Sequence, residues 1–140
     1  MIPVLAMIAL VSGASDIDPS GGAFLAVDLD SLETAARNAY DASDWETAAS
    51  EYVELLRHDV GNSTAIYNAA CCFGLMGEAG MSAAYLRAAA AAGFDDAGFA
   101  SEDPDFDPVR EDASFSSVLD SLMAVSSEDR AAMEFMVEVP

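Results

Sequence analysis

The chain has 140 residues, 53% of them apolar, which is enough for the core of one ordinary domain and too much for a disordered tail. Twenty-eight residues are alanine, a composition that favours helices over strands. The formal net charge is −20. This charge argues against binding to nucleic acid, because phosphate contacts need clustered cations, and equally against binding to an anionic membrane surface.

The N-terminal segment MIPVLAMIALV is almost wholly apolar. It is shorter than the about 20 residues that cross a bilayer as a helix, and it matches the apolar core of a secretory signal. Ser12 and Ala14 supply small residues at a cleavage-like spacing, so residues 1–14 are interpreted as a signal peptide and residues 15–29 as a linker. The protein would then be exported, periplasmic or secreted, with no stable membrane span after signal removal. No Lys or Arg precedes the apolar run, which leaves open an apolar helix packed on a cytoplasmic domain.

From Asp30 onward, apolar residues recur at helical spacing. Four helices are expected, over about residues 30–42, 45–58, 63–75 and 80–92. Asp30 or Ser31 is expected to cap the first helix and Asp44 the second. Gly77 and Gly93 follow the third and fourth helices, where glycine commonly ends a helix. The buried face of the first helix is predicted to contain Leu32, Ala35, Ala36, Ala39 and Tyr40.

These four helices form two copies of one unit. A shift of 34 residues places Leu32 on Ile66 and Ala36 on Ala70. The same shift places Ala48 on Ser82, Tyr52 on Leu86 and Asp44 on Glu78. This period and these small and large positions resemble the tetratricopeptide repeat family over residues 30–93. The resemblance implies an all-α fold, an antiparallel helix-hairpin solenoid of two full repeats.

The following segment, residues 94–124, resembles the acidic, Asp-Pro-rich closing segment of bacterial tetratricopeptide proteins. A short helix is expected over about residues 95–100, a turn over 103–108 and a last helix over about 114–123. This helical cap would complete a domain spanning residues 30–124. The residues expected to close the core are Phe94, Phe99, Phe106, Val109, Phe115, Val118, Leu119 and Leu122.

Asp103, Asp105 and Asp107 alternate as in a calcium-binding loop. Such a loop needs Gly at its sixth position and Glu at its twelfth, where this chain has Pro108 and Ser114. The aspartates are therefore interpreted as turn and capping residues, and no metal site is predicted.

Cys71, Cys72 and His58 carry no recognisable chemistry. The adjacent cysteines cannot form a disulfide without distorting a helix, and they lack the further ligands of a zinc site, so they are expected to be buried. His58 follows Arg57 at a helix end, where a cation complements the helix dipole. No nucleophile elbow or phosphate-binding loop is present in the sequence. We therefore expect no cofactor and no enzymatic activity.

The resemblance implies that the first helix of each hairpin lines a concave surface that binds a protein or peptide. Only one groove position is basic, so the multi-cation clamp that some family members use for a carboxylate is not reproduced. The candidate groove residues are Glu33, Arg37, Tyr40, Asp41, Thr64, Tyr67 and Cys71.

Residues 125–140 are interpreted either as a tail or as the start of a further domain. Phe135, Val137 and Val139 alternate with more polar or flexible residues, which predicts a half-buried strand. The phrase EFMVEVP is similar to the entry strand of exported α/β-hydrolases, so one alternative is the N-terminal region of an esterase or peptidase. A second alternative is a structural spacer or oligomerisation element.

Overall fold

The computed structural model describes residues 27–137, and the side chains of residues 27–126. The proposed signal peptide and most of the proposed linker lie outside the described residues. The described residues are all-α, with six α-helices, one 3-10 turn and no strand. The elements are α2 (Leu29–Asp41), α3 (Trp45–His58), α4 (Ser63–Leu75), α5 (Ala79–Ala91), α6 (Ala97–Glu102), η2 (Pro104–Phe106) and α7 (Ala113–Val137).

Side-chain caps fix where the first three of these helices begin. The carboxylate of Asp28 accepts hydrogen bonds from the backbone N–H groups of Asp30 and Ser31, at 3.1 and 3.2 Å. Asp30 and Ser31 therefore lie inside the first turn, and the prediction that one of them is the cap is wrong. Asp44 caps α3, as expected, and Asn62 caps α4.

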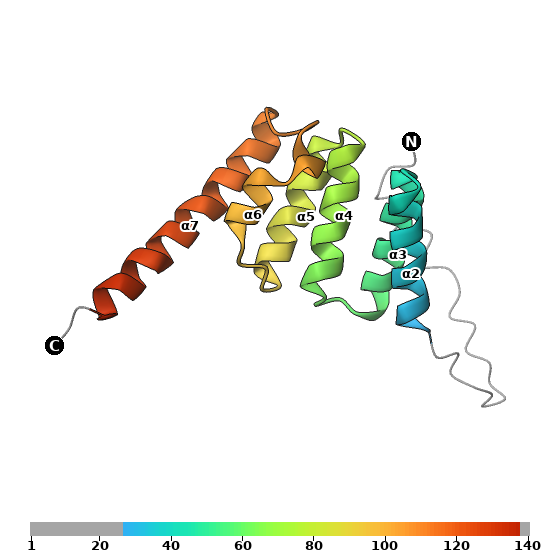
Figure 1. The fold of residues 1–140 in the computed structure, drawn as a ribbon, viewed down its shortest axis with the longest axis horizontal. Helices are drawn as coiled ribbons and strands as arrows, with labels where there is room; N and C mark the ends of the chain where they lie inside the picture. The colour runs from blue at the N-terminus through green and yellow to red at the C-terminus, as the bar shows by residue number, and fades with distance from the viewer. Residues whose placement is uncertain (1–26, 138–140) are drawn as a thin grey trace.

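Consecutive helices pack side by side in chain order, from α2 to α5, and α7 packs against α5 and α6 (Figure 1). Helix α4 lies in the centre, between α3, α5 and η2. It is buried on almost every side, which explains its nearly continuous apolar sequence. Two core clusters result, one shared by α2, α3 and α4, and one shared by α4, α5 and the C-terminal elements.

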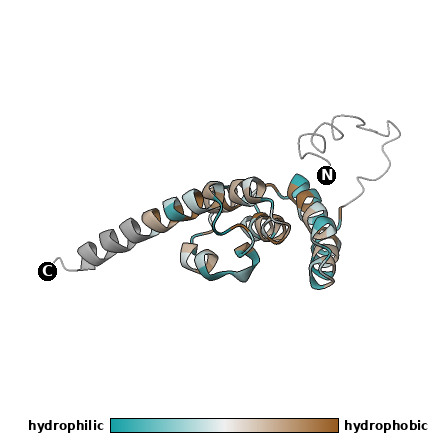
Figure 2. Cartoon of the chain, turned by 90° about the horizontal axis from the view of Figure 1, so that it is seen from above, coloured by the Kyte–Doolittle hydropathy of each residue, from teal (hydrophilic) through white to brown (hydrophobic). Residues whose placement is uncertain are grey.

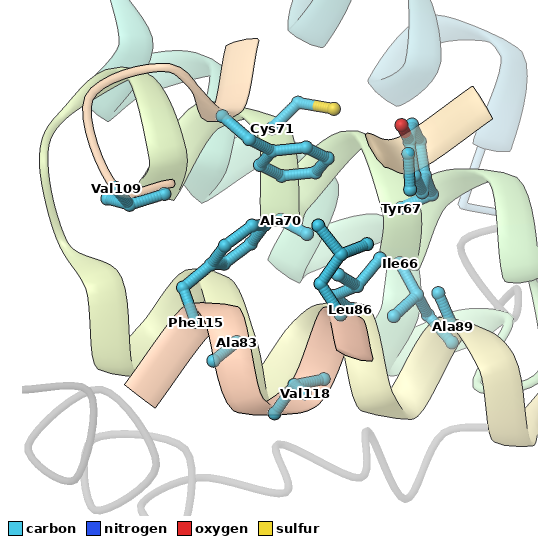
Figure 3. Packing of buried hydrophobic residues seen from close by; sticks show 13 residues of the cluster. Ile66, Tyr67, Ala70, Cys71, Ala83, Leu86, Ala89, Val109, Phe115 and Val118 are labelled. Carbon is cyan, nitrogen blue, oxygen red and sulfur yellow. The ribbon is translucent and has the colours of Figure 1, made fainter. Parts of the chain in front are cut away.

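Small residues lie at the same places in both hairpins. Ala36 and Ala70 have no exposed surface, which confirms the prediction that both are buried. Ala48 and Ser82 are likewise fully buried at equivalent positions, 34 residues apart. The hydroxyl of Ser82 donates a hydrogen bond to the carbonyl oxygen of Ala70 at 2.9 Å, so its polar group has a partner inside the core. Leu86 fills the space beside Ala70 (Figure 3).

The C-terminal elements close the second cluster. Phe106 and Phe115 are fully buried, with ring centroids 4.8 Å apart. Val109 and Val118 belong to the same cluster, and Figure 3 labels them with Phe115. Phe99 is 56% exposed, so its assignment to the core is wrong. The reason is local: α6 turns its small residues, Ala97 and Ala100, inward.

Ala35 is also exposed, contrary to its predicted place on the buried face of the first helix. Helix α2 packs mainly against one neighbour, α3, so its buried stripe is narrow. Ala36 lies at the centre of this stripe, and Leu32, Ala39 and Tyr40 pack beside it.

The last helix is longer than predicted. Helix α7 continues to Val137, and the predicted strand is wrong over residues 135–137, whereas residues 138–140 lie outside the described part. Ala131, Ala132 and Met133 precede this stretch and favour helix, and no sheet is available among the described elements. Helix α7 extends past the other helices, over its coloured part in Figure 2 and up to Val137 in Figure 1. Among the described helices, none combines the length and the apolar character needed to cross a membrane.

Candidate binding groove

A cavity of about 590 Å³ lies between α2, α4 and the segment that carries α6 and η2. Its walls are mainly aromatic and acidic. We call it the groove, and its lining residues are Arg37, Tyr40, Asp41, Tyr52, Thr64, Tyr67, Asn68, Cys71, Phe94, Phe99, Asp103, Pro104 and Asp105.

The structure brings six of the seven candidate groove residues together around this cavity. The exception is Glu33, which forms an ion pair with Arg37 at 2.7 Å and does not line the groove. Cys71 lies deepest of the six, at 4% exposure, whereas Thr64 lies on an exposed edge.

Sequence reasoning missed the wall opposite α4. Asp103, Pro104 and Asp105 were expected only to form a turn, but they also line the groove. The signal that could have found this contact is Gly74, because a glycine inside a helix is less stable than alanine and points to a packing reason. A Cβ at Gly74 would lie only 2.7 Å from the carbonyl oxygen of Asp105. Tyr52, Asn68, Phe94 and Phe99 were missed as well.

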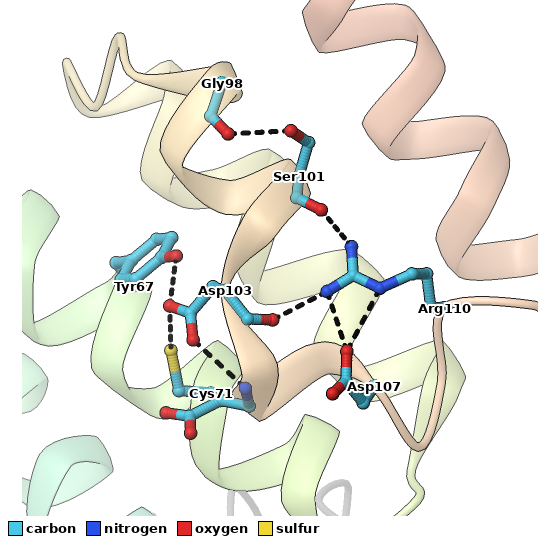
Figure 4. A network of polar contacts seen from close by, with 8 residues as sticks. Tyr67, Cys71, Gly98, Ser101, Asp103, Asp107 and Arg110 are labelled. Atoms are coloured by element: carbon cyan, nitrogen blue, oxygen red, sulfur yellow. Dashed lines mark hydrogen bonds and ion pairs between the residues drawn. The ribbon is translucent and has the colours of Figure 1, made fainter.

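Two tyrosine hydroxyls fix this wall to the helices. Tyr67 donates to Oδ2 of Asp103 at 2.7 Å (Figure 4), and Tyr40 donates to Oδ2 of Asp105 at 2.7 Å. The Sγ atom of Cys71 also lies 3.8 Å from Oδ2 of Asp103. Both turn carboxylates therefore face the groove from positions set by α2 and α4.

Arg110 contacts the backbone of the same turn (Figure 4). Its guanidinium donates to the backbone carbonyl of Asp103 at 2.7 Å and to the carbonyl of Ser101. It also pairs with the carboxylate of Asp107 at 3.1 Å. Arg110 thus contacts the main chain of Asp103 and leaves the carboxylate of Asp103 to the groove.

The electrostatics of the groove follow from burial and from the two neighbouring carboxylates. Burial raises the pKa of Asp105, and the nearby charge of Asp103 raises it further, whereas the hydrogen bond from Tyr40 opposes this shift. Burial, followed by the hydrogen bond to Asp103, raises the pKa of Tyr67, so its hydroxyl stays a proton donor. Burial and the two carboxylates also raise the pKa of Cys71, which keeps the thiol protonated and a poor nucleophile.

Cys71, Asp103 and Asp105 form a cluster of metal-ligating side chains, with one ligand atom from each within 4.8 Å of the others. A thiolate prefers soft metal ions and carboxylates prefer hard ones, so these three side chains together favour no particular metal ion. Both carboxylates are already engaged by tyrosine hydroxyls.

An aromatic wall borders the groove beside these carboxylates. The ring of Tyr67 stacks on Phe94, with centroids 4.4 Å apart, and lies 6.0 Å from the ring of Phe99. Since Phe99 is 56% exposed, this wall is open to solvent at one edge.

The other residues considered for chemistry lie outside the groove. His58 pairs with Glu54 at 3.3 Å near the end of α3. Cys72 is fully buried in the core, and its burial raises its pKa to about 12.

No protein-family model matches the chain, and no curated protein or solved structure matches it either. The groove is therefore interpreted from its own geometry.

Proposed function

We propose that this protein is a tetratricopeptide-type module that binds a protein or peptide segment in the groove and has no catalytic activity of its own. The observation that carries the proposal is the convergence of six candidate residues, chosen from the repeat register, on one cavity. They belong to two helices of equivalent position, α2 and α4.

The register itself gives further support. Equivalent small positions, such as Ala36 and Ala70, are equally buried, and the large residues Tyr52 and Leu86 are buried beside them. Stacked hairpins of this kind present the first helix of each repeat toward a shared concave surface. The groove is lined by residues of α2 and α4, which is the lining expected of such a surface.

The side chains of the groove are better suited to binding a peptide than to catalysing a reaction. Thr64 and Asn68 place a hydroxyl and an amide along one wall, and aromatic rings supply apolar contact area. Cys71, the thiol in the groove, has a raised pKa and is therefore a poor nucleophile. No histidine is among the described lining residues, so the groove lacks a cysteine–histidine pair of nucleophile and base.

The alternative of an N-terminal region of an exported esterase or peptidase depends on the strand predicted near the C-terminus. Helix α7 continues through Phe135 to Val137, which removes that support for the residues described.

Filling the groove tests the proposal. Peptide ligands would be selected from a displayed library on the full chain, and their binding compared between Thr64→Trp and Thr47→Trp. Thr64 is an exposed lining residue, whereas Thr47 is an exposed residue of α3 outside the groove. We expect Thr64→Trp to weaken binding at least about tenfold by occupying the cavity, with Thr47→Trp unchanged. Equal binding to both variants would contradict the proposal.

A further inference from the structure

We propose that the groove binds a cationic side chain, a lysine or arginine of the bound segment, between the two turn carboxylates and the aromatic wall. This inference rests on the proposed function and names the class of its ligand.

The first support is a pair of carboxylates without a cation. Asp103 and Asp105 are each half-buried and face the same part of the groove. Neither forms an ion pair with any described residue. Burying two neighbouring carboxylates without a counter-charge is unfavourable, and a bound ammonium or guanidinium would offset that cost.

The second support is the charge of the remaining lining. Asp41 adds a third carboxylate, and the one basic lining residue, Arg37, is already paired with Glu33. The chain as a whole carries −20, which attracts a basic segment from solution and repels an acidic one. Charge complementarity therefore favours a basic peptide over an acidic one.

The third support is the aromatic wall beside the carboxylates, which adds apolar contact to their charge. Phe99 is largely exposed at the groove, and it lies beside the stacked pair of Tyr67 and Phe94. The negative faces of such rings attract lysine and arginine within about 6 Å. Carboxylates next to aromatic rings can thus hold the charge and the apolar stem of the same side chain.

The test uses the full chain and a displayed library of short peptides without sequence bias. Selected peptides would be synthesised in pairs, with each lysine replaced by norleucine or each arginine by citrulline. Binding would be measured by calorimetry at low and at high salt, on the wild type and on Asp103→Asn, Asp105→Asn, Phe99→Leu, Thr64→Trp and Thr47→Trp. Asparagine keeps an acceptor oxygen for the tyrosine, and Phe99 is exposed, so these variants are expected to fold.

We expect selected peptides to be rich in lysine or arginine. Each Asp→Asn change, and each neutral peptide replacement, should weaken binding about tenfold, and high salt should weaken it as well. Phe99→Leu should weaken it by about threefold, because it keeps the apolar volume but removes the ring. Thr47→Trp should change nothing.

Other outcomes overturn the inference and separate it from the proposed function. If Thr64→Trp abolishes binding but neutral peptides bind as well as cationic ones, the groove binds peptides and the cationic ligand is wrong. If no peptide binds in a way that depends on Thr64, both proposals fail.

Discussion

The hydroxyl of Tyr67 donates a hydrogen bond of 2.7 Å to the carboxylate of Asp103, joining α4 to a turn 36 residues further along the chain. The bond does two things. It gives a largely buried tyrosine a partner, and it turns a carboxylate of the closing segment toward the cavity. The closing segment is thereby part of the groove as well as a cap on the core.

Replacing Tyr67 with Phe should destabilise the protein by about 1 kcal/mol, because the ring packing remains but the carboxylate of Asp103 loses its donor. Urea denaturation followed by circular dichroism measures this. Tyr85→Phe is the matched control, since its hydroxyl makes no hydrogen bond with the described residues. Equal stability of the two variants would show that the Tyr67 bond contributes nothing.

Replacing Gly74 with Ala should cost about 1–3 kcal/mol, although alanine is the better helix former. The added Cβ would meet the carbonyl oxygen of Asp105 at 2.7 Å and Cδ1 of Phe106 at 2.9 Å, so the turn must shift. Gly80→Ala is the control, because nothing lies within 4 Å of a Cβ there. We expect that control to be neutral or stabilising by up to about 1 kcal/mol in thermal denaturation.

Replacing Ala36 with Leu should destabilise the first hairpin by about 1–3 kcal/mol through overpacking, because Ala36 has no exposed surface between α2 and α3. The neighbouring Ala35→Leu changes an exposed position of the same helix and should stay within about 0.5 kcal/mol of the wild type. Comparable losses from the two substitutions would contradict the assignment of the buried face.

The pH dependence of stability should carry the signature of Asp105. Its pKa is raised in the folded protein, chiefly by burial, above its usual value of 3.8. The folded state therefore binds this proton more tightly than the unfolded state, and the contribution of this group to stability rises as pH falls from 7 toward that value.

Asp105→Asn should remove this contribution, so the unfolding free energy of the wild type minus that of the variant should increase on acidification. Asp120→Asn, at an exposed position of α7, controls for the loss of one negative charge. A difference for Asp105→Asn that stays constant between pH 7 and pH 4 would refute the raised pKa.

The sequence was sufficient for the elements whose signals are local. Helical spacing, Asp44 as a cap and Gly93 after α5 place helices α3 to α5 within about one residue of their observed bounds. The burial of Ala36 and Ala70 followed from a register argument between two hairpins.

Features that depend on tertiary contacts could not be predicted from local sequence signals. The exposure of Phe99 depends on how α6 packs. The alternation of apolar and other residues over 135–139 resembles that of a strand, although the residues before it are helical and α7 continues to Val137. The acidic wall required knowing that Asp105 approaches α4 at Gly74. Pattern reasoning placed one wall of the groove and missed the opposite one.

Mapping the bound peptide by backbone amide chemical shifts tests the central claim most directly. Binding in the groove predicts the largest shifts around Tyr40 in α2, Tyr67 in α4, and Phe94, Phe99 and residues 103–105, all of which line the cavity. Shifts confined to α7, or to exposed positions of α3 and α5 such as Thr47 and Arg87, would contradict it.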